Sequence, residues 1–469
     1  VKTISPGGLA TTTSYDSLGR ISQTRDPAGN VTTYECGPEG SPLAGLLIQI
    51  NYPTYKEAYQ YDQRGRQTAV TQHLGQGQTR VQRQAYDAAG QRISATDPAG
   101  HSTLYQYDAL GRLIQTTDAL GGQTRQSWDA HEQLTSLTDA KGNTHQFEYD
   151  KVGQLIQETR PMGGAIRYAY DAAGQLTKRT DAGGNTRNYT YDAAQRMTLE
   201  EHKLSGQQTD QKISYQYDKD GQLKGYEQTD GQGQLISHAS YQRDAQGRVA
   251  TNGHTYGKED GTTLSFQIGQ SFNADGQLQS HQYPDGSQQG YSYEQGRLSK
   301  VTLPNQSEIS YQNYSWMAPG QISTPGAIKT QTFDALQRPT SIEVESQTSN
   351  SQGSQTAQRL MSRLYQYDQA GNITQIKSEL GSTDYGYDKL SRLTQAKPDN
   401  ALQALGLPAE QYGYDAVHNR TSSGHQPGQW SYNADNQLIQ YPHLLPFSPG
   451  TQPIDTSVSY TAQGHTQKE

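Results

Sequence analysis

The stretch YDALGRLIQTTDALG, residues 107–121, holds one strand-like segment between two turn signals, and its pattern returns along the chain. An aromatic residue followed by Asp recurs every 21 residues between positions 86 and 192. The six strict copies are Tyr86-Asp87, Tyr107-Asp108, Trp128-Asp129, Tyr149-Asp150, Tyr170-Asp171 and Tyr191-Asp192. Looser copies extend from Tyr15-Asp16 to Tyr432-Asn433. A repeat of this density determines the architecture, so this unit is the starting point for the fold.

Each unit contains two turns. The first is Asp-x-x-Gly directly after the aromatic residue, and its glycines include Gly111, Gly153 and Gly174. Asp at the first position accepts backbone hydrogen bonds and Gly at the fourth tolerates positive φ, which favours a type I turn closing a hairpin through a bulge. The second turn follows eleven residues after the aromatic, as at Asp97-Pro98-Ala99-Gly100. The Thr- and Tyr-rich segments between the turns are typical of strands.

The unit therefore predicts strand, turn, strand, turn in one continuous antiparallel meander. An apolar residue stands six positions after the aromatic, as Leu113 does after Tyr107, so each strand pair presents about two apolar side chains on one face. We expect a repeat domain over residues 1–441 and a repeat-poor tail over residues 442–469. The Ser- and Gln-rich segment 345–358 is interpreted as an exposed flexible loop. Residues 401–406 could form one helical turn that ends before Pro408.

The composition excludes a conventional packed core. Hydrophobic residues make up 31% of the chain and 33 residues are Tyr. Leu, Ile, Val and Phe together reach roughly 15%, below the ~20% at which disorder becomes a serious interpretation. Disorder is nevertheless disfavoured, because the net charge is only -8 and the aromatic content is 9%. An ordered protein with a thin apolar layer is the remaining class.

The number of strands then indicates the shape. A meander of about 35 strands is far longer than the ~10 strands at which open sheets twist, curl or close. With so little apolar material the ribbon cannot fold back into stacked solid layers. The sequence therefore predicts an all-β fold in which YD-type hairpins spiral into a hollow β-shell.

Several functional classes find no support in the sequence. The chain has no apolar run long enough to span a membrane, and its single cysteine, Cys36, cannot form an internal disulfide. A pI near 5.9 gives no electrostatic case for nucleic acid. Metal-binding, nucleophile-elbow and phosphate-loop motifs are absent, and the carboxylates coincide with turn positions. No catalytic residue, cofactor or metal is therefore predicted, and the 33 tyrosines are interpreted as packing residues rather than a stacking platform for sugars or bases.

Tyr107-Asp108-Ala109-Leu110-Gly111-Arg112-Leu113, together with the Thr-Asp-Pro-x-Gly pattern at 96–100, resembles the YD repeat of Rhs proteins. The same repeat occurs in the C subunit of bacterial Tc toxins and in animal teneurins. With one cysteine and Gln-rich turns, the chain looks bacterial. The resemblance implies a β-shell that encloses a C-terminal toxin domain of the same polyprotein until delivery. It also implies a protein made in a bacterium and exported by a specialised secretion system, with a spike or adaptor, a chaperone and an immunity protein as partners.

Two features of that family are not found in the sequence. There is no Asp-Pro-x-Gly-Leu segment of the kind that carries the self-cleaving aspartates, and no divergent toxin domain. We therefore expect a non-enzymatic shell portion of a longer protein, an expectation to which the absence of a leader at Val1 contributes. The leading alternative is an adhesin or carbohydrate-binding protein at the bacterial cell surface. An enzyme with a degenerate site is the least favoured class.

Overall fold

The computed structural model describes residues 1–206, 208–349, 355–424, 426, 428, 430–443, 454–460 and 466–468. Nearly all elements in this part of the chain are strands, and the one helix described there is α1 (Asn400–Ala404). The first strands are β1 (Lys2–Ile4), β2 (Ala10–Tyr15), β3 (Ile21–Arg25), β4 (Val31–Cys36), β5 (Leu47–Asn51), β6 (Lys56–Tyr61), β7 (Gln67–His73), β8 (Thr79–Tyr86), β9 (Arg92–Thr96), β10 (Ser102–Tyr107), β11 (Leu113–Thr117), β12 (Gln123–Trp128), β13 (Leu134–Thr138) and β14 (Thr144–Tyr149).

The middle strands are β15 (Leu155–Thr159), β16 (Ala165–Tyr170), β17 (Leu176–Thr180), β18 (Thr186–Tyr191), β19 (Met197–Lys203), β20 (Thr209–Tyr217), β21 (Leu223–Asp230), β22 (Leu235–Arg243), β23 (Val249–Gly257), β24 (Thr263–Phe272), β25 (Leu278–Gln282), β26 (Gln288–Glu294), β27 (Arg297–Thr302) and β28 (Glu308–Ser315). The last strands are β29 (Ala318–Thr324), β30 (Ala327–Phe333), β31 (Pro339–Ser349), β32 (Gln355–Tyr367), β33 (Ile373–Ser378), β34 (Ser382–Tyr387), β35 (Leu393–Pro398), β36 (Glu410–Tyr414), β37 (Arg420–Ser423), β38 (Ser431–Tyr432), β39 (Leu438–His443), β40 (Ile454–Ser457), β41 (Ser459–Tyr460) and β42 (Thr466–Lys468).

The strands form one antiparallel meander, as the repeat predicts. β1 to β37 belong to a single 37-stranded sheet in which each strand pairs with the next in the chain. The first turn of each unit contains the expected bulge: Gln106 pairs with Gln115 and Tyr107 with Leu113, so one extra residue lies on β11. Gly111 has a φ of 86°, the left-handed conformation that this turn requires.

The sheet has two edges that differ in their turns. We call the edge formed by the turns directly after the aromatic residue, such as 108–111, the YD edge. The edge formed by the turns eleven residues after the aromatic, such as 118–121, is the return edge. This alternation follows from the meander, because successive hairpins close on opposite sides of the ribbon.

The segment 345–358 departs from the expected flexible loop. β31 and β32 extend through most of it as one long hairpin, while residues 350–354 lie outside the described part. The ladder continues there because β31 is also paired on its other side, with Ile328 opposite Glu345 and Ala327 opposite Ser346. The helical turn near 401–406 is present as α1, and the Asp399 side chain accepts the backbone N–H of Leu402 at its start.

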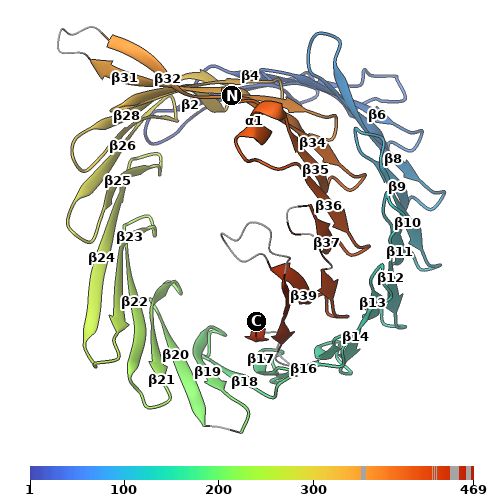
Figure 1. Ribbon diagram of the computed structural model, residues 1–469, viewed down its shortest axis with the longest axis vertical. Helices are drawn as coiled ribbons and strands as arrows, with labels where there is room; N and C mark the ends of the chain where they lie inside the picture. The colour runs from blue at the N-terminus through green and yellow to red at the C-terminus, as the bar shows by residue number, and fades with distance from the viewer. Residues whose placement is uncertain are drawn as a thin grey trace.

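The wall is thin, as the composition predicts. Among the residues that the structure describes, the buried apolar side chains are few: Ile50, Ala69, Ile166, Ala239, Val301, Pro398, Leu402, Pro442 and Val458. The ribbon curves round in a ring and then begins a second pass, in which β34 to β37 lie beside the earlier arc of β8 to β14 (Figure 1). The ring is not closed by strand pairing, because β1 pairs only with β2 among the described strands. The predicted all-β spiral shell is thus confirmed as a fold, as an open spiral.

Strands also occur in the described part of the tail beyond residue 441. β39 crosses that position and pairs with β40, where Gln440 lies opposite Ser457. The hairpin of β41 and β42 has the same bulged register as the repeat, with Tyr460 opposite Thr466. The Tyr460 hydroxyl donates to the Leu438 carbonyl at 2.8 Å. The features of the hairpin unit therefore continue past the last repeat that the sequence pattern identified.

Candidate functional site: hairpin links and the seam

The repeat aromatics connect each hairpin to the preceding one through a hydrogen bond. The hydroxyls of Tyr149, Tyr170 and Tyr191 donate to the carbonyls of Leu134, Leu155 and Leu176 at 3.0, 2.9 and 2.9 Å. Trp128 makes the same link with its indole, Nε1 donating to the Leu113 carbonyl at 2.8 Å. Tyr107 donates to the Arg92 carbonyl at 3.0 Å. The sequence pattern indicated packing for these residues but did not reveal this polar link.

The repeat aspartates organise the first turn. Asp108 Oδ1 accepts the backbone N–H groups of Leu110 and Arg112 at 2.9 and 3.0 Å, and Oδ2 accepts Arg112 Nε at 2.7 Å. The backbone N–H of Arg112, together with its guanidinium, holds the pKa of Asp108 below its ordinary 3.8. Asp150 and Asp171 accept the corresponding backbone bonds, Asp150 from Val152 and Gln154.

The arginine of the turn is a second link between successive hairpins. Arg112 Nη1 donates to the Asp129 carbonyl at 2.5 Å, in the next YD turn. Arg66 makes the equivalent bond to Asp87 at 3.0 Å, and its guanidinium lies over the Tyr86 ring at 4.8 Å. Because the hydroxyl and guanidinium links both run between neighbouring hairpins, each unit is fixed relative to the last by more than its strand ladder.

The second pass of the ribbon rests on the first along a seam. Asp275 accepts hydrogen bonds from Ser5 Oγ and Gly7 N at 2.5 and 2.7 Å. Further along, Thr54 Oγ1 donates to the Ala335 carbonyl at 2.7 Å. Still further, Arg80 Nε donates to the Gln369 carbonyl at 2.6 Å. In all three contacts the later residue lies at the YD edge and the earlier one at the return edge.

The same rule holds at the far end of the seam. Lys141 Nζ donates to Asp415 Oδ2 at 3.1 Å, and Met162 N donates to Asp435 Oδ1 at 3.2 Å. The partners are 268 to 290 residues apart in the chain, about thirteen 21-residue units. A nearly constant offset means that one circuit of the spiral contains a nearly constant number of hairpins. The seam, unlike the strand ladder, depends on side chains and turn backbone alone.

Aromatic residues also meet across the seam. The Tyr52 ring stacks on Tyr55 with centroids 4.7 Å apart and lies 5.8 Å from Trp316, a residue of the second pass. Burial and the nearby Glu57 carboxylate raise the pKa of Tyr55 to about 12. At this place the tyrosines act as packing residues between the two passes.

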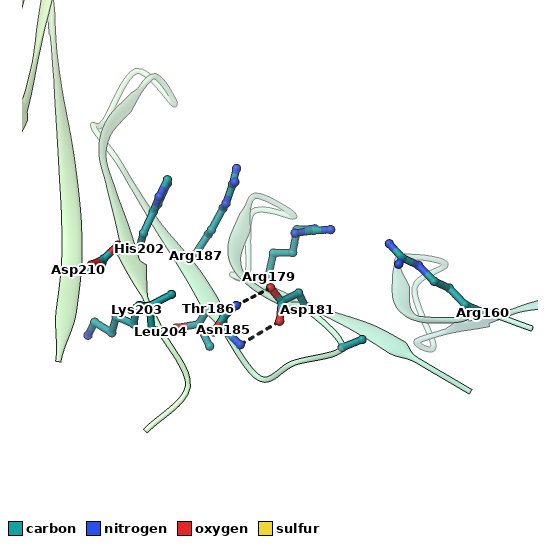
Figure 2. A pocket seen from close by; sticks show the side chains of 11 residues that line it. Arg160, Arg179, Asp181, Asn185, Thr186, Arg187, His202, Lys203, Leu204 and Asp210 are labelled. Atoms are coloured by element: carbon teal, nitrogen blue, oxygen red, sulfur yellow. Dashed lines mark hydrogen bonds between the residues drawn. The ribbon is translucent and has the colours of Figure 1, made fainter. Parts of the chain in front are cut away.

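A basic hollow with a volume of about 220 Å³ lies at the return edge of β17, β18 and β19. Arg160, Arg179, Arg187, His202 and Lys203 line it, and Figure 2 shows the side chains of Arg179, Arg187 and His202 projecting to the same side of the strands. Two carboxylates, Asp181 and Asp210, also line it. The sequence pattern indicated Asp181 as a turn residue but gave no signal for the five cationic residues.

Two kinds of functional feature are absent from the part of the chain that the structure describes. No group of three or more His, Cys, Asp or Glu side chains there has an arrangement suited to a metal ion. In the same ranges, none of the helical structure has the length and hydropathy needed to cross a membrane.

Comparison with known proteins agrees with the repeat and the fold. The RHS Repeat family matches residues 86–123, 109–144, 149–186, 170–208, 272–308 and 367–400. Over 107 residues the chain is 37% identical to the double-stranded DNA deaminase toxin A of Burkholderia cenocepacia (strain H111), a match spanning 23% of this chain and 7% of that protein.

Solved structures match over almost the whole chain. TcdB2-TccC3 without its hypervariable C-terminal region aligns with a TM-score of 0.72 and 17% identity, covering 97% of this chain and 25% of that one. The Tc holotoxin pore of Photorhabdus luminescens aligns with a TM-score of 0.68 and 15% identity, covering 97% of this chain and 29% of that one. The chain thus spans less than a third of each of these two proteins. The six matched RHS repeats identify it as an Rhs/YD-repeat protein, and its fold agrees.

Proposed function

We propose that the chain is a wall section of a shell that encloses a toxin domain of the same polyprotein until delivery. The observation that carries this proposal is the seam, in which the YD edge of the second pass rests on the return edge of the first. Stacking of passes lets a one-layer ribbon build height around a central space, although it buries few apolar side chains. Containment is a function that needs such a wall and no catalytic residue.

The names of similar proteins support the toxin part of the proposal. One is a deaminase toxin, and one is described by a hypervariable C-terminal region that was removed. By analogy, the guest of this shell is a C-terminal domain with its own chemistry. A chaperone, a secretion spike or adaptor and an immunity protein are the partners that such a system requires, with release from a bacterium as the place of action.

The test is protease protection in the natural protein that contains this chain. Trypsin is added to the intact protein, and fragments are identified by mass spectrometry alongside cryo-electron microscopy. We expect the guest region to resist digestion until the shell is opened with denaturant, with additional density inside the wall. Equal digestion of the guest before and after opening would overturn the proposal. Specific hits on a glycan array, combined with an empty wall, would favour the surface adhesin instead.

A further inference from the structure

The basic hollow departs from the repeat at three positions. At the start of the second turn most strict units have Asp, as at Asp118, Asp139 and Asp181, whereas one has Arg160. Asp181 shows what the carboxylate does there, because its Oδ1 accepts the backbone N–H groups of Gly183 and Asn185, both at 2.9 Å. Arginine has no acceptor and cannot replace that role. The need to form this turn therefore does not explain why residue 160 is an arginine.

The other two departures lie within strands. These two cross-strand positions hold Thr116 with Thr124, Leu137 with His145 and Glu158 with Ile166 in earlier units, and Arg179 with Arg187 beside the hollow. None of the three earlier pairs joins two like charges. Natural proteins break the local rules of a repeat mainly at functional sites, so an arginine pair at these positions, together with Arg160, points to a ligand.

The register places one guanidinium directly against another. Arg179 of β17 is paired with Arg187 of β18, which is paired in turn with His202 of β19. Like charges directly opposite in a sheet are destabilising. Glu200 neutralises this cluster only in part: it lies 3.6 Å from Arg187 and 2.7 Å from His202. Arg179 has no ion pair within the ranges that the structure describes.

The cations remain accessible from the hollow. The Arg187 side chain is 53% exposed. Four cationic side chains, those of Arg160, Arg179, Arg187 and Lys203, line the hollow against two carboxylates, and one of these, Asp181, is already engaged in its own turn. An anionic ligand would relieve the repulsion between the paired arginines and gain charge-assisted hydrogen bonds.

The seam identifies the class of anion. Where the return edge is covered by the second pass, carboxylates of hairpin turns repeatedly fill it: Asp275, Asp415 and Asp435. Asp435 rests on Met162 N, two residues from Arg160, so the hollow is next to this described contact along the same edge. We propose that Arg160, Arg179 and Arg187 bind carboxylate groups of an acidic polypeptide segment. The planar guanidinium suits this task, because it can bind both oxygens of a carboxylate.

The test measures binding of a fluorescently labelled hexaglutamate peptide to the full chain by anisotropy at low salt. We expect saturable binding that Arg179→Gln combined with Arg187→Gln weakens about tenfold or more, since two charge-assisted contacts are lost. The matched control combines Arg125→Gln and Arg167→Gln. These exposed arginines lie in β12 and β16 and do not line the hollow, and they change the net charge equally.

The outcomes separate the site from general electrostatics. Weakening confined to the first double variant, with unchanged circular dichroism in both, supports the site. Equal weakening by both double variants would mean that only net charge matters and would overturn it, as would absence of binding to the unaltered chain. Inorganic phosphate is the competing anion in a displacement experiment. Displacement by phosphate at concentrations below those needed for unlabelled hexaglutamate would overturn the assignment to a polypeptide.

Discussion

At the residue scale, the hydroxyl of the repeat tyrosine has a structural role that the hydrophobic pattern of the sequence does not indicate. Tyr170 donates to the Leu155 carbonyl at 2.9 Å, and burial raises the pKa of its hydroxyl. Replacing Tyr170 with Phe keeps the ring and removes the bond, so a carbonyl in the wall loses its donor. We expect Tyr170→Phe to lower the free energy of unfolding in urea by about 1 kcal/mol.

Tyr168 is a matched control for that substitution. It lies two residues earlier on the same face of β16, and no hydrogen bond from its hydroxyl exists within the described residues. Tyr168→Phe should leave the urea midpoint nearly unchanged. Equal losses in the two variants would show that the hydroxyl link to Leu155 does not contribute.

The aspartates of the YD turns predict how stability depends on pH. Arg112 holds the pKa of Asp108 below 3.8, through its backbone N–H first and its guanidinium second. The pKa values of Asp16, Asp62 and Asp192 are lowered in equivalent turns. A carboxylate whose pKa is lower in the folded state stabilises the fold above the unfolded pKa of about 3.9 and loses this effect as pH falls through the folded value.

We therefore expect a melting temperature that is nearly constant from about pH 7 to pH 5 and falls steeply below about pH 4. Differential scanning fluorimetry across this range measures it. A melting temperature unchanged down to pH 3 would contradict the turn assignment. A fall confined to the range between pH 7 and pH 5.5 would instead indicate histidines as the titrating groups.

At the element scale, the YD turn can hold a residue other than glycine at its fourth position, at a cost in the free energy of unfolding. Glu132 stands where Gly111 stands in the preceding unit, and its φ is 64°. A residue with a Cβ in this conformation costs about 1 to 2 kcal/mol relative to glycine. We expect Glu132→Gly to raise the free energy of unfolding of the local hairpins by about 1 kcal/mol.

Glu132→Ala is the control, because it removes the side chain but keeps the strained φ, and it should give no comparable gain. Gly111→Val should act in the opposite direction, with a loss of about 1 to 2 kcal/mol. Hydrogen exchange of individual hairpins is the measurement, since repeat arrays couple mainly to their neighbours. Equal stabilisation by Gly and Ala at position 132 would contradict the argument.

Elements could be predicted from the sequence where a residue type itself determines the backbone conformation. The Asp-x-x-Gly spacing correctly placed the bulged turn at 108–111, since Gly111 tolerates the φ of 86° there. The described residues of segment 345–358 were wrongly expected as part of a flexible loop, because the Ser and Gln residues of this segment resemble a linker in composition. At its start Glu345 pairs with Ile328 of β30, a contact that composition does not indicate.

At the scale of the whole molecule, strand number and thin composition correctly predicted an open-centred spiral, but not how its passes meet. Several seam contacts end on backbone carbonyls, including those of Ala335 and Gln369, so they require no particular residue on one side. The basic hollow was missed for a related reason. Arg179 and Arg187 are eight positions apart in the chain and meet only through the strand register.

The seam can be opened without disturbing the hairpins. Arg80 donates to the carbonyls of Gln369 and Ala370 at 2.6 and 3.2 Å, and Lys141 pairs with Asp415 at 3.1 Å. Combining Arg80→Ala with Lys141→Asp removes the first contact and places like charges at the second. We expect the free energy that holds the two passes together to fall by about 2 to 3 kcal/mol. No backbone strand pairing among the described residues crosses the seam to compensate for this loss.

We expect this double variant to show a larger maximum dimension in small-angle X-ray scattering with unchanged circular dichroism, because the second pass swings away while its strands persist. Arg125→Ala combined with Lys151→Asp is the control. Arg125 lies on β12 and donates to Gln115 and Gln123, and Lys151 lies at the YD edge of the first pass; both are exposed, and the charge change is identical. The two variants differ only in whether the altered side chains lie on the seam. The same scattering curve from both would therefore mean that the curvature of the sheet alone holds the spiral together. The seam would then have no role in enclosing a guest.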